Sequence, residues 1–227
     1  MGMEWYDAIA RRNGGYKSNA IYSVEGQSGE QVFEERLKEL LAFSKHALDA
    51  GCGHGDFTIR MSSFGSRITG LDNSIEMIKL AEASLHDTPN PAIRFIHATT
   101  KEKLPFEDGE FDLIYNRRGP TSILNHARIL KPKGKIIGIH TGAMEVVKER
   151  LASNEFVNIE VEIFDQAMIY FPNDRELAKF LTGVPGNIDY TNPDNIELFR
   201  ARKEPFILHD GRLGMREWKY IWTAEKR

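Results

Sequence analysis

Three alternating glycines follow a short apolar segment and an acid in this chain. Residues 47–61 read Ala-Leu-Asp-Ala-Gly-Cys-Gly-His-Gly-Asp-Phe-Thr-Ile-Arg-Met. Glycine permits unusual φ values and lets backbone N–H groups approach a ligand closely, and a helix that starts after such a loop offers further free donors. The pattern therefore predicts a strand, a turn that binds the polar part of a nucleotide-like ligand, and then a helix.

A second acid, Asp72, comes after Asp49 along the chain, at the end of the apolar segment 67–71. In a parallel α/β sheet, ligands bind outside the carboxyl ends of the strands, near the point where the strand order reverses. We therefore expect the glycines and Asp72 to meet on one ligand, with the Asp72 carboxylate accepting both hydroxyls of a ribose. The alternative role for Asp72 is to cap a helix that starts at 73–77. NAD(P) and S-adenosylmethionine both fit this arrangement.

The spacing of the glycines separates these two cofactors. The nicotinamide fingerprint places glycines at relative positions one, three and six, whereas here the third glycine is Gly55 and position six is Asp56. A carboxylate at Asp49, two residues before Gly51, would repel a pyrophosphate but could accept hydrogen bonds from the amino group of a methionine moiety. The loop therefore favours S-adenosylmethionine.

Four segments in order resemble the class I S-adenosylmethionine-dependent methyltransferases, over residues 30–150 and the last strand. They are the glycine motif at 48–55, the second-strand acid at 70–72, and the runs at 104–114 and 129–136 around the fourth and fifth strands. The resemblance implies an α/β fold with a Rossmann-like seven-stranded sheet, order 3-2-1-4-5-7-6, strand 7 antiparallel and helices on both faces. It implies S-adenosylmethionine as cofactor, S-adenosylhomocysteine as product, and cofactor contacts from Asp49, Ala50, Gly51, Cys52, Gly53, Asp72, Asn73, Met77, Thr99 and Asn116.

The hydrophobic pattern supplies the elements that position these residues. Apolar, β-branched-rich segments predict buried parallel strands, and a helical spacing of apolar residues predicts a helix before the first of them. We expect one domain over 1–227, with an N-terminal cap and the first helix in 1–45 and an insertion at 171–205 that covers the cofactor cleft. The predicted strands are 47–50, 67–71, 93–98, 111–116, 135–141, 157–163 and 218–223, with a helix at 144–153.

The acceptor side of the site carries weaker signals. Tyr22 could line the methyl site, and His140 at the end of the fifth strand could act as a general base or be a buried structural histidine. Arg117 and Arg118 follow the fourth strand and could bind an anionic acceptor or form exposed ion pairs. A base is needed only where the acceptor is protonated at neutral pH, because the methyl group of S-adenosylmethionine is already activated.

Composition favours an ordinary enzyme: 227 residues, 28% charged, with a formal charge of −3. No apolar run approaches the roughly 20 residues that span a bilayer, and the start lacks the features of a signal peptide, so we expect a cytoplasmic protein. One cysteine and scattered histidines predict no metal site.

The chain has no basic stripe, which favours a small-molecule acceptor for the methyl group. Methylation of RNA, tRNA or protein is the alternative. The third function class is an NAD(P)-dependent oxidoreductase or a non-catalytic nucleotide binder.

Overall fold

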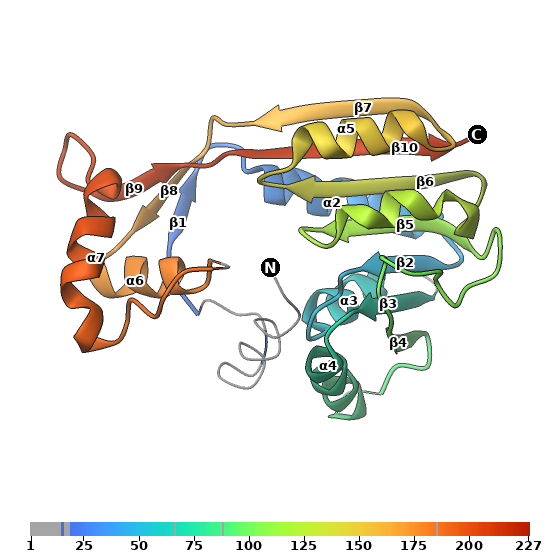
Figure 1. Ribbon diagram of the computed structural model, residues 1–227, viewed down its shortest axis with the longest axis horizontal. Coiled ribbons are helices and arrows are strands. Elements are labelled where there is room, and N and C mark those ends of the chain that lie inside the picture. The colour runs from blue at the N-terminus through green and yellow to red at the C-terminus, as the bar shows by residue number, and fades with distance from the viewer. Residues whose placement is uncertain (1–14, 16–18, 66, 88, 185) are drawn as a thin grey trace. The chain divides into compact units, whose positions relative to one another are not determined.

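The computed structural model describes residues 15, 19–65, 67–87, 89–184 and 186–227 (Figure 1). The chain divides into two compact units. The larger unit consists of residues 29–163 and 219–227, and the smaller contains the described residues of 1–28 together with 164–218. In the part of the predicted N-terminal cap that precedes Asn19, only Gly15 is among the described residues.

The larger unit is built on a seven-stranded sheet in the order β4-β3-β2-β5-β6-β10-β7. Strands β2 to β6 pair in parallel, and β10 runs antiparallel to β6. Numbered from the first strand of this sheet, this is the order 3-2-1-4-5-7-6, so the predicted fold class is confirmed. The strands are β2 (Ala47–Ala50), β3 (Ile68–Asp72), β4 (Ile93–His97), β5 (Phe111–Arg117), β6 (Leu130–His140), β7 (Phe156–Phe164) and β10 (Lys219–Lys226).

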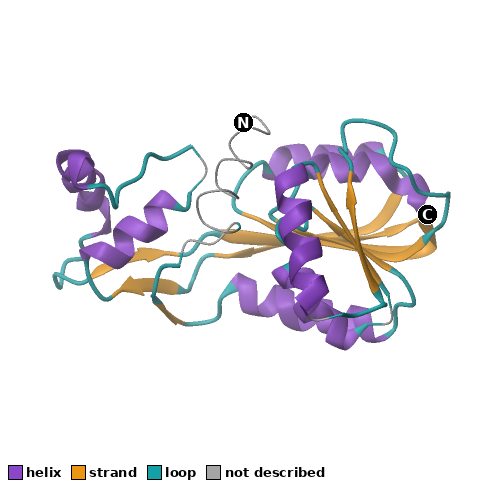
Figure 2. Cartoon of the chain, turned by 90° about the horizontal axis from the view of Figure 1, so that it is seen from below, coloured by secondary structure: helices purple, strands orange, loops and turns teal. Residues whose placement is uncertain are grey.

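Helices cover both faces of this sheet (Figure 2). Burial on two faces explains why the central strands are continuous apolar runs rather than alternating ones; every residue of β2 is buried, for example. Helix α2 turns Phe33, Leu37 and Leu41 into the protein at helical spacing, as predicted. The helices are α2 (Gly29–Ala42), α3 (Asp56–Met61), α4 (Ile75–Asp87) and α5 (Met144–Ser153), with 3-10 segments η1 (Ser62–Phe64) and η2 (Thr121–Ile129).

The smaller unit has its own sheet and core. Its three antiparallel strands lie in the order β1-β8-β9, and apolar side chains of β8 and two helices pack together, including Phe171, Leu177, Leu181 and Phe199. The elements are β1 (Ser23–Glu25), β8 (Met168–Phe171), α6 (Asp174–Thr182), η3 (Pro193–Asn195), α7 (Ile196–Lys203), η4 (Glu204–Phe206) and β9 (Leu213–Arg216).

The predicted insertion, 171–205, falls in this smaller unit and contains α6 and α7. The sheet beside these helices was not predicted. That the insertion covers the cofactor cleft stays a prediction. None of the helices described here combines the length and the apolar character needed to cross a membrane.

Candidate functional site

The glycine loop connects β2 to α3, and its three glycines serve different ends. A β-carbon at Gly51 would lie 2.8 Å from the Cα of Gly119, and one at Gly55 would lie 2.7 Å from the Phe95 ring, so both positions are required for packing. Gly53 has φ +55°, but a β-carbon there would meet nothing within 4 Å. The open face of the loop is therefore at Gly53, where a ligand could lie directly against the backbone.

Four backbone N–H groups of this loop donate hydrogen bonds within the protein, whereas the free donors expected at the start of α3 stay a prediction. The amides of Gly51 and Cys52 both donate to the Leu71 carbonyl, at 2.8 and 3.0 Å, and the amide of Gly55 donates to the Cys52 carbonyl at 3.1 Å. The amide of Gly53 donates to Asp72 at 2.9 Å. Because a pyrophosphate needs such amides free, this loop is poorly suited to bind one.

Asp72 joins the glycine loop to the end of β3. Its Oδ2 accepts from the Gly53 amide and its Oδ1 accepts from the Ser74 amide, each at 2.9 Å. The Ser74 hydroxyl in turn accepts from the Met77 amide at 3.2 Å, at the start of α4. Burial raises the pKa of Asp72, while the amides of Ser74, Gly53 and Asn73 oppose that rise. Ser74, rather than Asp72, caps the helix at Met77, and the ribose contact of Asp72 stays a prediction.

Asp49 lies beneath the loop, not on its open face. Its side chain is 1% exposed and accepts a hydrogen bond of 2.7 Å from the Thr58 hydroxyl. Burial raises the pKa of Asp49 to about 7. The Tyr115 side chain is also fully buried nearby, and burial together with the Asp49 carboxylate raises the pKa of its hydroxyl. This placement favours an electrostatic influence of Asp49 on a nearby cation over the predicted direct contact with an amino group.

The loop after β5 packs against the glycine loop. Asn116 shapes it, because its Oδ1 accepts from the Gly119 amide at 2.7 Å and its Nδ2 donates to the Pro120 carbonyl at 2.9 Å. A β-carbon at Gly119 would overlap the carbonyl oxygen of Ala50. Both polar atoms of the Asn116 side chain are thus occupied within the loop, so Asn116 positions the neighbouring backbone.

The two predicted acceptor arginines differ in their surroundings. Arg117 pairs through Nε with Glu30 and stacks on Phe57, with its Cζ 4.5 Å from the ring centre. Arg118 has a left-handed backbone, φ +62°, and its Nη2 is 3.9 Å from Glu30 Oε1. Its side chain is 42% exposed, against 29% for Arg117. Arg117 is therefore fixed by the protein, and Arg118 is the more available of the two.

Both ring nitrogens of His140 are occupied. The indole N–H of Trp222 donates to Nδ1 at 3.1 Å, so the ring proton is on Nε2, which donates to the Gly119 carbonyl at 3.1 Å. Burial, with a contribution from Arg118, lowers the pKa of His140, and the Gly119 carbonyl opposes that shift. This geometry favours the structural alternative for His140 over a general base.

The remaining predicted contacts lie around the loop. Ala50, Cys52 and Met77 are buried, whereas Asn73 and Thr99 are half-buried. Thr99 Oγ1 accepts from the Lys101 amide at 3.3 Å, and its carbonyl accepts from the Glu102 amide at 3.2 Å. No group of three or more histidine, cysteine, aspartate or glutamate side chains in the described ranges is arranged to hold a metal ion.

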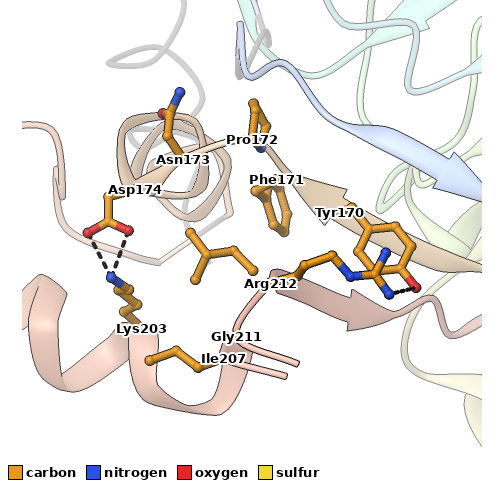
Figure 3. Close-up of a pocket in the computed structure, with 10 residues that line it drawn as sticks. Tyr170, Phe171, Pro172, Asn173, Asp174, Lys203, Ile207, Gly211 and Arg212 are labelled. Carbon is orange, nitrogen blue, oxygen red and sulfur yellow. Dashed lines mark hydrogen bonds and ion pairs between the residues drawn. The ribbon is translucent and has the colours of Figure 1, made fainter. Parts of the chain in front are cut away.

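Tyr22 belongs to the smaller unit. It is 45% exposed, packs edge-on against Phe171 and Phe180, and lines a hollow of about 250 Å³. A neighbouring hollow of about 670 Å³ in the same unit has an ion pair between Lys203 and Asp174 at one end and Arg212 over the Tyr170 ring at the other (Figure 3). Neither hollow contains a predicted cofactor residue, and the place of Tyr22 at a methyl site stays a prediction.

Sequence reasoning missed several residues of the site, namely Glu30, Thr58, Ser74 and Tyr115. Ser74 carried a signal, because serine directly before an apolar-periodic segment is a common helix cap. Thr58 and Tyr115 are identified only by the fold, since α3 and β5 bring them to Asp49 from separate parts of the chain.

Residues 47–134 match a family model described as a methyltransferase domain. Over this segment the chain is similar to the methyltransferase domains of the class I S-adenosylmethionine-dependent family. The chain is 34% identical over 117 residues to the demethylmenaquinone methyltransferase of Lactococcus lactis subsp. lactis (strain IL1403). That match covers 47% of this chain and 45% of the relative, so less than half of the relative's own length is matched.

Solved structures share the fold of this chain. A functionally unknown protein from Deinococcus radiodurans R1 is 26% identical, with a TM-score of 0.69 over 99% of this chain and 100% of that one. The geranyl diphosphate C-methyltransferase of Streptomyces coelicolor A3(2), solved with Mg²⁺, geranyl diphosphate and S-adenosylhomocysteine, is 18% identical. Its TM-score is 0.55 over 87% of this chain and 79% of that chain. At this identity the second structure shows the shared fold alone.

Proposed function

We propose that this protein transfers a methyl group from S-adenosylmethionine to a small-molecule acceptor. One observation carries the choice of cofactor: the amides of Gly51, Cys52, Gly53 and Gly55 are all bonded within the protein. These four amides are not available to a pyrophosphate, and the loop offers a ligand an open glycine surface and nearby carboxylates. It therefore suits the cationic methionine end of S-adenosylmethionine better than NAD(P).

The residues around the loop fit this cofactor. Gly53 leaves space for it, Asp72 lies at the end of β3 where a ribose would be held, and Asp49 supplies a buried acid beneath the loop. When bound, S-adenosylmethionine supplies an activated methyl group. The chain's own residues would align the acceptor and exclude water, effects that contribute up to roughly 7–11 kcal/mol in well-oriented reactions. Asn116 contributes by fixing the loop that packs on Gly51.

A small-molecule acceptor in the cytoplasm is the finer part of this proposal. The Lactococcus relative is named for methylation of demethylmenaquinone, a small molecule, which supports the class of acceptor without naming it for this chain. Methylation of RNA, tRNA or protein remains the alternative.

The test distinguishes a small-molecule acceptor from a macromolecular one by the fraction that receives the labelled methyl group. The protein is incubated with methyl-labelled S-adenosylmethionine and a bacterial extract. The products are divided into an acid-precipitated macromolecular fraction and a small-molecule fraction, from which unreacted S-adenosylmethionine is removed by chromatography. Label in the small-molecule fraction, absent with Gly53→Ala, supports the proposal. Label confined to precipitated RNA or protein would replace it with the alternative, and label in neither fraction would contradict methyl transfer to a component of that extract.

A further inference from the structure

The carboxyl end of β5 lies where the strand order reverses. Strand β2 has β3 on one side and β5 on the other (Figure 1), and ligands of open α/β sheets bind outside the strands at such a point. Arg117 is the last residue of β5, and Arg118 follows it directly. Gly119, the next residue, contacts Gly51 of the glycine loop. The two arginines are therefore placed beside the proposed cofactor site.

Glu30 of α2 forms ion pairs with cationic side chains at the carboxyl end of β5. Its Oε1 pairs with Arg117, and its Oε2 accepts from Lys219 Nζ at 3.0 Å. Although burial alone would raise its pKa, Arg118, Arg117 and Lys219 outweigh burial and lower the pKa of Glu30 to about 2. Each oxygen of the carboxylate thus already has a cationic partner before Arg118 is considered.

Arg118, the third cation, makes no hydrogen bond to the Glu30 carboxylate. Its Nη2 lies 3.9 Å from Glu30 Oε1, beyond hydrogen-bond distance, and its guanidinium makes no hydrogen bond to the residues that the structure describes. Arg36 has nearly the same exposure, 40%, but bonds Glu162 at 2.7 Å. The exposure of its side chain alone therefore does not explain why the Arg118 guanidinium lacks a hydrogen-bond acceptor.

The backbone of Arg118 is held in an uncommon conformation. Its φ is +62°, in the left-handed region that costs a non-glycine residue free energy. Its amide donates to the Ile139 carbonyl of β6 at 2.9 Å, which fixes the residue between the ends of β5 and β6. Such strain is typical of residues placed for binding.

The other titratable groups near Arg118 do not neutralise it. The ring of His140 accepts a hydrogen bond from Trp222 at Nδ1, and burial lowers its pKa. Asp49, the second acid near this edge, is buried beneath the loop and bonded to Thr58. A planar guanidinium with free N–H donors is well matched to carboxylate and phosphate oxygens.

We propose that Arg118 binds an oxyanion, a carboxylate or a phosphate, carried by the methyl acceptor. Arg117 and Lys219 are positioning residues, because both are held by Glu30 and add fixed positive charge beside Arg118. This inference rests on the proposed function, since it assigns the acceptor class to the same site. It narrows the acceptor from any small molecule to one with an anionic group.

The experiment measures anion binding to the full chain saturated with S-adenosylhomocysteine. Calorimetric titrations use inorganic phosphate, benzoate and neutral benzamide at constant ionic strength, because screening would otherwise change with each addition. Arg118→Gln removes the charge, Arg118→Lys retains it, and Arg36→Gln is the control of nearly equal exposure. Phosphate and benzoate together distinguish the two kinds of oxyanion.

We expect phosphate or benzoate, but not benzamide, to bind saturably. Arg118→Gln should weaken that binding about tenfold or more, as for loss of a charge-assisted hydrogen bond, with Arg118→Lys in between and Arg36→Gln unchanged. Equal affinity in Arg118→Gln, or no preference for the anions, would overturn the inference. Saturation with S-adenosylhomocysteine is measured first, so its failure would count against the proposed function, whereas anion failure after saturation counts against Arg118 alone.

Discussion

The carboxylate of Asp72 accepts a hydrogen bond of 2.9 Å from the backbone amide of Gly53, at the middle of the glycine loop. The same carboxylate accepts from the Ser74 amide at the start of α4. One side chain therefore holds the shape of the loop and of the helix start together. A ligand that bonds Asp72 would act on both.

Asp72→Asn should weaken S-adenosylhomocysteine binding without unfolding the protein. The amide can keep one of the two backbone bonds, but it places an NH₂ group against the other donor. A titration of the variant beside Asp87→Asn, whose parent side chain is 86% exposed, measures the effect. Equal affinity in both variants would remove Asp72 from the site.

Gly53→Ala should fold but bind the cofactor about tenfold or more weakly, because its methyl group would fill the open face of the loop. The backbone penalty, about 1 kcal/mol for a left-handed residue, is matched by Gly109→Ala. Gly109 has φ +67°, and a β-carbon there would be 3.8 Å from its nearest neighbour. We expect urea unfolding to show similar losses of stability in the two variants, and cofactor affinity to fall only in Gly53→Ala. A Gly53→Ala protein that binds the cofactor normally would show that the ligand lies elsewhere.

Cofactor affinity should rise with pH between about 6 and 8. Burial raises the pKa of Asp49 to about 7, so part of the empty protein carries a protonated Asp49 at neutral pH. A cationic ligand nearby favours the ionised carboxylate, and binding then releases a proton. The dissociation constant should fall about tenfold from pH 6 to pH 8. Asp49→Asn should flatten this dependence, and a slope that survives the substitution would assign it to another group.

His140 should carry its proton on Nε2 and have a pKa below 6.5. Nitrogen-15 NMR of the imidazole rings reports both. Trp222→Phe, which removes the donor to Nδ1, should alter the His140 signals while leaving cofactor affinity unchanged. A ring that is doubly protonated near pH 7 would restore His140 as a candidate for acid–base chemistry.

Glu30→Gln should destabilise the protein in a pH-dependent way. The pKa of Glu30 is lowered from 4.5 to about 2, so its contribution is fully present above about pH 4.5 and is lost as the pH falls through 2. We expect the variant to lose about 2–3 kcal/mol at pH 7 and less than half of that near pH 3. Urea unfolding at both pH values measures it, and a constant difference would show that the charge of Glu30 is not the cause.

The parallel strands were predictable because strands that are buried on both faces appear in the sequence as continuous apolar runs. The predicted first strand, 47–50, matches β2, and the helix predicted at 144–153 matches α5. β6 begins at Leu130, ahead of the predicted strand at 135–141. Its first residues include Pro132 and Gly134, which do not resemble a central strand.

The sequence gives no comparable signal for the three-stranded sheet β1-β8-β9. β1 spans only Ser23–Glu25, and its partner β8 comes after the whole parallel part of the large sheet in the chain. A strand this short shows no usable period, and its pairing is decided by tertiary packing.

At the site, the sequence predicted that Asp72 and the glycine loop meet, but not where their polar atoms point. The glycine pattern gives conformational freedom at Gly51 and Gly53, yet their amides are bonded to Leu71 and Asp72. The side chain of Asn116 closes its own loop, and its predicted contact with the cofactor stays a prediction. Such directions depend on the register between β2, β3 and β5, which no local pattern encodes.

Thermal unfolding with S-adenosylhomocysteine, set against NAD and NADP, tests the central claim most directly. At about one hundred times the dissociation constant, a ligand of the native state adds about 2.7 kcal/mol, or about 5–10 °C for a chain of this size. We predict this shift with S-adenosylhomocysteine alone, and its loss in Gly53→Ala. A shift with NAD or NADP and none with S-adenosylhomocysteine would contradict the assignment of the loop and point to an oxidoreductase.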